Sequence, residues 1–226
     1  MAEAGTRTAE RVLALLAVVC ERGRANLSEA ARATGLAPST ALRLLRTLEG
    51  AGFVRRDDDA SFTPGGRIIQ LGAQALSNES LVDLTRPAMK TLADATGESV
   101  YLSTLGHHET ALYIAIVEGS HSIRHRSWVG NTIPLDGTAA GQALTGAVPA
   151  GSWALVRSGV ESDVTAIAAP IQVGRRVVAA LSLVVPSYRL SEADASRYGR
   201  LVAAEVATIS SQLAGPAGHN LEGATA

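Results

Sequence analysis

The sequence has few of the features that mark secreted or membrane proteins. Its 226 residues include one cysteine, Cys20, so no disulfide can form within the chain. Cys20 lies in the apolar run 12–20, which we interpret as a core-facing helix carrying a structural thiol rather than a reactive one. The acidic Glu3 and Glu10 precede this run, and no small-residue cleavage site follows it. Both features argue against a signal peptide. No apolar stretch reaches the roughly 18 residues that span a bilayer. These features predict a cytoplasmic protein.

Aromatic residues and net charge are also scarce. Aromatic side chains make up 4% of the chain, so a core must be built mainly from alanine, valine, leucine and isoleucine. The hydrophobic fraction of 46% excludes a disordered chain. The 20 basic and 21 acidic residues leave a formal charge of −1, so the chain is not a general polycation. Any contact with nucleic acid must therefore come from a local basic surface.

The pattern of the first 51 residues predicts three helices. Apolar residues at helical spacing indicate an amphipathic helix over 8–21. Ser28 is the expected N-cap of a short second helix that ends at Thr34, and Gly35 supplies the stop. A third helix is expected over 38–51, because proline is tolerated in a first helical turn. Two short helices joined by a glycine turn are typical of a helix-turn-helix.

The third helix has an apolar face and a polar face. Hydroxyl groups on such a polar face bind phosphates, and guanidinium groups bind the O6 and N7 atoms of guanine. A solvated helix face with two arginines is nevertheless common, so the helix alone does not decide for DNA. The residues expected to pack inward are Ala41, Leu44, Leu45 and Leu48. The candidate DNA-binding residues on this helix are Ser39, Thr40, Arg43, Arg46 and Thr47.

The segment after the third helix favours DNA binding. Residues 53–56 and 61–65 read as two short strands around an acidic turn, which completes a winged helix-turn-helix. Arg55 and Arg56 on this wing are expected near the DNA backbone or minor groove, with the acidic turn directed away. Between residues 38 and 56 there are four arginines and one acidic residue. This local excess of positive charge predicts a surface for double-stranded DNA.

Several blocks resemble the IclR family of bacterial transcriptional regulators. The segment 34–58 resembles that family's recognition helix and wing. The segments 97–105, 129–146 and 165–191 resemble further blocks of the family, the second through its Thr-Ala-x-Gly-x-Ala-Leu pattern. Their order and spacing over most of 7–213 carry the resemblance.

The resemblance implies an α+β fold with two domains. It implies a winged helix-turn-helix over 7–65, a linker helix over 66–78, and an effector-binding domain over 79–214. The second domain would have a GAF/PAS-like shape, with an antiparallel sheet flanked by helices. The tail 215–226 has no periodicity and is expected to be disordered.

The residue pattern of the second half agrees with this fold. A turn is expected at Gly174, and Ser191 with Asp194 forms a weak capping box. Helices are expected over 66–77, 80–97 and from Ser191 to about Leu213. Strands are expected over 100–105, 111–117, 122–128, 165–171 and 176–185.

The resemblance also places an effector pocket in the second domain. Backbone N–H groups at a helix start over 137–141 could hold a carboxylate, or the small residues there could merely permit close packing. The sequence departs from the family in a short connection between 138–144 and 165–171, and in Ala166 and Val184 where relatives often have polar residues. These departures predict a more apolar or more open pocket, or one that has lost its ligand. The pocket residues implied by the resemblance are Ile133, Ala139, Ala140, Thr165, Ala166 and Ser182.

Enzymatic and metal-binding readings find little support. No Gly-x-Ser-x-Gly, P-loop or Gly-x-Gly-x-x-Gly pattern is present, so no enzyme and no cofactor are expected. His121 and His125 have a spacing that suits a metal on a helix, but their segment reads as a strand flanked by arginines.

The expected function is a repressor or activator that binds operator DNA as a homodimer or a dimer of dimers. Its effector would be a small organic molecule such as a carboxylic acid. The alternative is a small-molecule sensor or enzyme that uses the helix-turn-helix only to dimerise.

Overall fold

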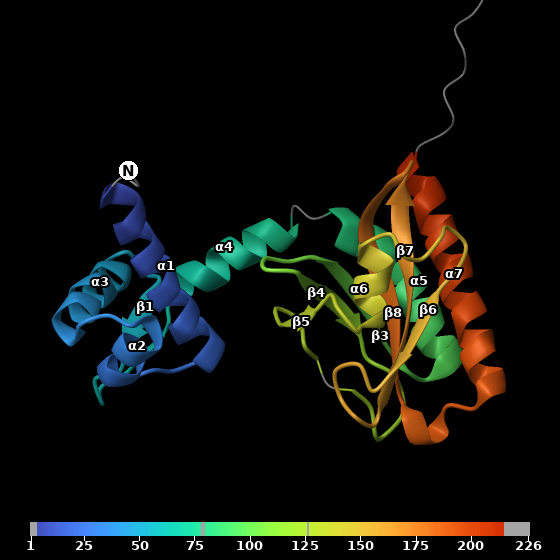
Figure 1. Ribbon diagram of the computed structural model, residues 1–226, viewed down its shortest axis with the longest axis horizontal. Helices are drawn as coiled ribbons and strands as arrows, with labels where there is room; N and C mark the ends of the chain where they lie inside the picture. The colour runs from blue at the N-terminus through green and yellow to red at the C-terminus, as the bar shows by residue number, and fades with distance from the viewer. Residues whose placement is uncertain (1–3, 78–79, 126, 215–226) are drawn as a thin grey trace, which may run out of the picture. The chain divides into compact units, whose positions relative to one another are not determined.

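The computed structural model describes residues 4–77, 80–125 and 127–214, and the chain forms two compact units (Figure 1). One unit reaches to residue 78 and the other begins at residue 79. Among the described residues, no helix combines the length and the hydropathy needed to cross a bilayer.

The first unit is a three-helix bundle followed by a small hairpin and a further helix. Its helices are α1 (Ala4–Arg22), α2 (Leu27–Thr34), α3 (Pro38–Gly50) and α4 (Gly66–Ser77). The strands β1 (Val54–Arg56) and β2 (Phe62–Pro64) pair antiparallel. The four apolar residues predicted for the inner face of α3 are all buried, in one cluster with Leu15 and Phe62. The three helices and the hairpin predicted from the sequence are therefore confirmed.

The start of α2 lies two residues before the predicted position. Asn26, rather than Ser28, is the N-cap, since its side-chain oxygen accepts the Glu29 N–H at 2.9 Å. Glu29 in turn accepts the Asn26 N–H at 2.9 Å, which completes a capping box. The prediction was wrong because the Asn-x-x-Glu spacing decides the boundary here. Gly35 ends the helix at φ +65°, as predicted.

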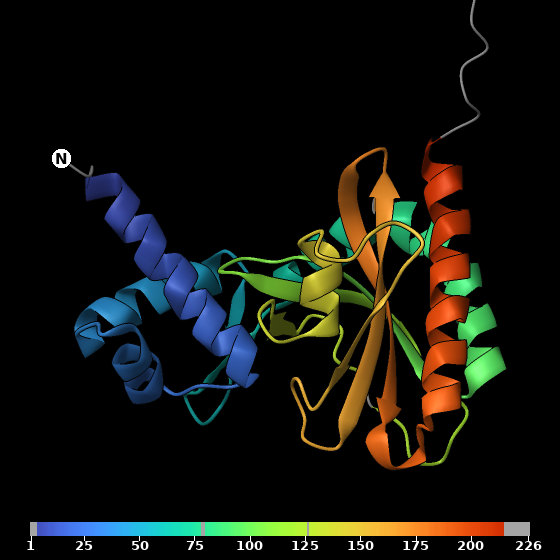
Figure 2. The same ribbon diagram turned by 45° about the vertical axis from the view of Figure 1, so that its right-hand side comes forward.

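The second unit has a six-stranded antiparallel sheet between helices. Figure 2 shows α5 and α7 on one face of this sheet and α6 on the other. The sheet order is β5-β4-β3-β8-β7-β6. Its helices are α5 (Ser80–Thr96), α6 (Ala139–Leu144) and α7 (Glu192–Ala214), with a short 3-10 turn, η1 (Ser187–Arg189). Its strands are β3 (Ser99–Leu105), β4 (Thr110–Val117), β5 (Thr132–Pro134), β6 (Ala154–Arg157), β7 (Val164–Val173) and β8 (Arg176–Pro186).

Strand alternation divides the buried residues of this sheet between two cores. On β7 and β8, Ile167 and Leu181 pack in the core beneath α5 and α7. Ala168 and Ala180 pack instead in the core that includes α6. Over 164–171 and 179–185, even-numbered residues therefore face the α6 side and odd-numbered residues face α5 and α7, and a register shift after Ile171 reverses this order at Val177 and Val178.

One strand prediction was wrong. The described residues of 122–128 form a loop, and the strand beside β4 on the side away from β3 is β5, further along the chain. The loop is held by the Ser99 hydroxyl, which donates to the His125 carbonyl at 3.1 Å. Alternation of apolar and polar residues had suggested a strand, but the chain here turns His125 and Trp128 inward. The expected disordered tail lies outside the described residues.

Three predicted boundaries of the second unit are present in the structure, namely the start of α7, the end of α5 and the turn between β7 and β8. The Ser191 hydroxyl caps α7 by accepting the Asp194 N–H at 3.0 Å, as predicted. Gly97, which was predicted to close α5, follows it directly with φ +74°. The predicted turn at Gly174 between β7 and β8 is also present, at φ +60°.

Candidate functional site

The outward face of α3 carries the residues that the sequence singled out. Arg43 and Arg46 are exposed one turn apart, and Ser39 and Thr47 are exposed beside them. Thr40 is half-buried at the edge of this face. Within the described chain neither arginine is held in an ion pair, so both guanidinium groups can reach a ligand. The face is polar and positively charged, and among the described residues no carboxylate lies within ion-pair distance of either arginine.

The wing is more neutral than the sequence suggested. The Arg55 Nε lies 3.1 Å from an Asp57 carboxylate oxygen, and Arg24 pairs with Asp59. The Ser61 N–H and Arg24 lower the pKa of Asp59, so this carboxylate stays ionised. Arg56 is exposed, and no ion pair within the described residues holds it. Of the two wing arginines, Arg56 is therefore the one that is ready to contact a phosphate.

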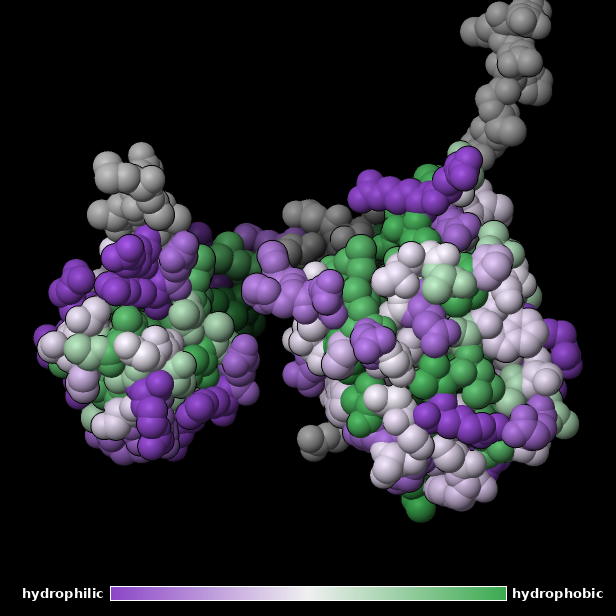
Figure 3. Space-filling model, viewed as in Figure 1, coloured by the Kyte–Doolittle hydropathy of each residue, from purple (hydrophilic) through white to green (hydrophobic). Residues whose placement is uncertain are grey.

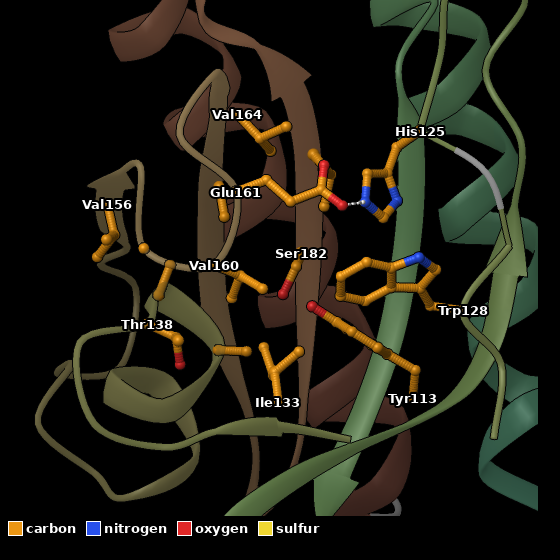
Figure 4. Close-up of a pocket in the computed structure, with 15 residues that line it drawn as sticks. Tyr113, His125, Trp128, Ile133, Thr138, Val156, Val160, Glu161, Val164 and Ser182 are labelled. Atoms are coloured by element: carbon orange, nitrogen blue, oxygen red, sulfur yellow. Dashed lines mark ion pairs between the residues drawn. The ribbon is translucent and has the colours of Figure 1, made fainter. Parts of the chain in front are cut away.

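A cavity that is partly open to solvent lies on the α6 side of the sheet in the second unit (Figure 4). Side chains from β4, β5, α6, β7 and β8 line it, together with the connection between β6 and β7. Five of the six predicted pocket residues line this cavity, namely Ile133, Ala139, Ala140, Ala166 and Ser182.

Thr165 does not line the cavity. It is odd-numbered on β7, so its side chain is buried on the opposite face from Ala166. There its hydroxyl forms a hydrogen bond with the Ser187 hydroxyl at 2.8 Å. Thr165 therefore joins the sheet to η1, and it could not share a cavity with Ala166.

Two hydroxyl groups face the cavity from its buried side. The Ser182 hydroxyl is buried, at 1% exposure, and has no hydrogen-bond partner among the described residues. The Tyr113 hydroxyl points into the same space (Figure 4). Burial and the negative charge of Glu161 raise the pKa of Tyr113 to about 12, so it is a neutral hydrogen-bond donor or acceptor at pH 7.

The other side of the cavity is formed by His125, Trp128 and Glu161, none of which the sequence had placed in the pocket. His125 Nδ1 lies 2.6 Å from the Tyr101 hydroxyl, and its Nε2 lies 3.7 Å from a Glu161 carboxylate oxygen. The Trp128 ring packs edge-on against His125, with ring centroids 4.9 Å apart. Two of the four tyrosines, Tyr101 and Tyr113, and one of the two tryptophans, Trp128, therefore lie in or next to this side of the cavity. Their scarcity in the chain was the one signal that could have pointed to this site.

The start of α6 packs closely against the chain segment that precedes it. The Gly141 N–H donates to the Thr138 hydroxyl at 3.1 Å, so this amide is already satisfied. A side chain at Gly141 would collide with the Leu135 carbonyl. These contacts favour the close-packing alternative for the small residues of this segment.

The two histidines considered for metal binding contact different glutamates. His121 approaches Glu98 at 3.7 Å, whereas His125 approaches Glu161. Among the residues that the structure describes, no three metal-ligating side chains come together.

Comparison with known proteins identifies relatives over both units. The model of the IclR helix-turn-helix domain matches residues 8–58. The model of the bacterial transcriptional regulator IclR C-terminal domain matches residues 73–154 and 147–211. The two stretches of the second match overlap over residues 147–154.

Similar proteins include transcriptional regulators of known name. The transcriptional repressor IclR of Escherichia coli is 31% identical over 138 residues, which cover 59% of this chain and 50% of the repressor. The glycerol operon regulatory protein of Streptomyces coelicolor is 34% identical over 60% of this chain and 54% of its own length. The chain spans about half the length of the curated relatives that it matches.

Solved structures share the fold over nearly the whole chain. An IclR family regulator from Brucella abortus superposes with a TM-score of 0.78 and 23% identity, over 93% of this chain and 97% of that chain. An IclR homologue from Microbacterium hydrocarbonoxydans, complexed with 4-hydroxybenzoate, gives a TM-score of 0.72 and 19% identity, over 91% and 99%. Since the family models cover well over half of its length, this chain belongs to the IclR family of bacterial transcriptional regulators.

Proposed function

We propose that this chain is a sequence-specific DNA-binding regulator whose affinity for its operator changes when a small organic effector occupies the cavity. The observation that carries the proposal is the exposed face of α3, where Arg43 and Arg46 stand unpaired in a winged helix. A helix of this kind enters the major groove and reads base edges. The relatives are named as regulators rather than as enzymes, which supports the same conclusion.

The proposed active form is a homodimer on a roughly palindromic operator. Half-sites would lie about one helical turn apart, or a multiple of it. Leu13 on α1 is 64% exposed and Ile69 on α4 is 72% exposed, which supports pairing through these two helices. Figure 3 shows hydrophobic surface along α4. A dimer of dimers through the second unit and a location in the cytoplasm, where the operator lies, belong to the same proposal.

The effector would act by favouring one arrangement of the paired recognition helices. A coupling free energy of about 1–3 kcal/mol would change operator affinity roughly 5- to 150-fold. Repression or activation depends on where the operator lies relative to the promoter.

The test is DNA binding by the protein and its arginine variants, beginning with the DNA upstream of its own gene. Arg43→Ala should weaken specific binding by about 1–3 kcal/mol, because a bidentate contact to a base would be lost. Arg56→Ala should weaken binding to all sequences alike and reduce the salt dependence, because it would lose a phosphate contact. Arg200→Ala, an exposed arginine on α7, is the matched control and should bind normally.

Full operator affinity in both Arg43→Ala and Arg46→Ala would contradict the role of α3. Complete absence of salt-dependent DNA binding would favour the alternative, in which the helix-turn-helix serves only dimerisation.

A further inference from the structure

The charge of the cavity is negative. Among the described residues that line it, Glu161 is the carboxylate, and none is a lysine or an arginine. The negative charge of Glu161 acts on Tyr113, since it adds to the effect of burial in raising the pKa of this tyrosine. His125, whose Nε2 lies 3.7 Å from the Glu161 carboxylate, is the one other lining residue among those described that can carry a charge, and most of the rest are alanine, valine and isoleucine. The electrostatic environment therefore disfavours an anion and favours a cation.

Aromatic rings stand beside this carboxylate. Figure 4 shows Trp128 and Tyr113 pointing into the cavity next to His125 and Glu161. The electron-rich faces of tryptophan and tyrosine rings attract cations within about 6 Å. A carboxylate with neighbouring aromatic rings is a suitable environment for an ammonium group.

The two polar ends of the cavity differ in exposure. The Glu161 side chain is 40% exposed, which places it near the open side. Ser182 is 1% exposed, and its hydroxyl lacks a partner. A buried hydroxyl without a hydrogen bond is unfavourable by about 1–3 kcal/mol, so its presence at the wall of a cavity points to a ligand that satisfies it.

We propose that this cavity selects a small organic cation: an ammonium group held by Glu161 and the aromatic rings, an apolar ring-sized body, and a hydroxyl group that pairs with Ser182. The inference rests on the proposed function in one respect, because it takes the occupant of the cavity to be the effector. It differs from the sequence-based expectation of a carboxylic acid. A carboxylate ligand would meet Glu161 as a like charge, and the Gly141 amide at the start of α6 is already bonded.

Three ligands whose head groups are positive, neutral and negative provide the test. They are 4-hydroxybenzylamine, 4-hydroxybenzyl alcohol and 4-hydroxybenzoate, which share the ring and the para hydroxyl. Calorimetric titration of the full chain should give the tightest binding for the amine, about tenfold tighter than for the alcohol. Binding of the benzoate should be weaker than that of the alcohol.

Variants test whether Glu161 and Ser182 are responsible for this order of ligand affinities. Glu161→Gln should reduce the preference for the amine over the alcohol to about twofold or less. Glu192→Gln, whose carboxylate pairs with Arg157 outside the cavity, is the matched control and should leave the preference unchanged. Benzylamine, which lacks the para hydroxyl, should bind the native protein less tightly than 4-hydroxybenzylamine. Ser182→Ala should remove that difference.

The proposal is overturned if the benzoate binds as tightly as the amine, if Glu161→Gln leaves the order unchanged, or if none of the three ligands binds. Operator binding is measured on the same protein without ligand. Normal operator binding with the wrong ligand order refutes the cation site alone. The expected ligand order without operator binding refutes the regulator and leaves the cation site standing.

Discussion

Replacing Ser182 by alanine should make the unliganded protein more stable. The hydroxyl is buried at 1% exposure without a partner among the described residues. Burying such a group is unfavourable by about 1–3 kcal/mol, and removing it should recover about 1 kcal/mol. The packing loss is small, because the missing oxygen borders a cavity that is already present. For a chain of this size, about 1 kcal/mol corresponds to a rise in Tm of roughly 2–4 °C.

The same substitution should reduce stabilisation by the effector. A bound ligand that pairs with Ser182 converts the unfavourable hydroxyl into a hydrogen-bonded one, and Ser182→Ala forfeits this gain. Thermal unfolding with and without 4-hydroxybenzylamine measures both effects in one experiment. We expect a higher Tm for the free variant and a smaller ligand-induced rise in Tm than for the native protein.

Ser99→Ala is the matched control, with an effect of opposite sign. Ser99 is also fully buried, but its hydroxyl accepts the Gly119 N–H at 3.2 Å and donates to the His125 carbonyl at 3.1 Å. Its loss leaves both backbone groups without this partner and should destabilise the protein by about 1–3 kcal/mol. A free Ser182→Ala protein that is less stable than the native one would refute the reasoning, since the hydroxyl would then have a partner of its own.

Four further predictions concern stability. Arg189→Ala should destabilise the protein by about 3–5 kcal/mol in chemical unfolding, because it leaves the carboxylate of Glu98, 2% exposed, without its bidentate partner at 2.7 Å. Arg157→Ala breaks an exposed pair and should change stability by less than about 1 kcal/mol. The raised pKa of Tyr113 means that the unfolded chain releases this proton first, so the free energy of unfolding should fall between about pH 10 and pH 12, and Tyr113→Phe should lessen the fall. Asn26→Ala should lower the stability of α2 by about 1 kcal/mol, as helical circular dichroism during urea unfolding would reveal.

The sequence was most informative where one periodicity governs a whole element. The inner face of α3 follows from apolar residues at helical spacing, and glycines at 35 and 97 end helices at positive φ. Strand alternation on β7 and β8 was visible as well, although it could not say which face holds the cavity. Packing of α6 on that sheet decides the question, and this is a contact between segments far apart in the chain.

The site itself was predictable only in part. Thr165 and Ala166 were both assigned to the pocket, yet neighbouring residues on a strand face opposite ways. His125 and Trp128 were read as part of a strand, and no local pattern announces that a loop turns both inward. Glu161 lies in the connection between β6 and β7, outside the blocks that carried the resemblance to the family. Loop residues acquire their neighbours from the tertiary structure, which explains why they escaped a reading based on local periodicity.

The connection between β6 and β7 forms one wall of the cavity through Gly159, Val160 and Glu161. Ser158 adopts φ +56°, its hydroxyl donates to the Ser162 carbonyl at 2.5 Å, and its N–H donates to the Val164 carbonyl at 2.8 Å. A side chain at Gly159 would lie 2.7 Å from the Gly137 carbonyl, so the turn packs closely against the segment before α6. This turn carries Glu161, whose side chain lines the cavity. Since the sheet contributes apolar residues and hydroxyls while this turn contributes the charge, the charge preference of the cavity can change through the turn alone, without disturbing the sheet.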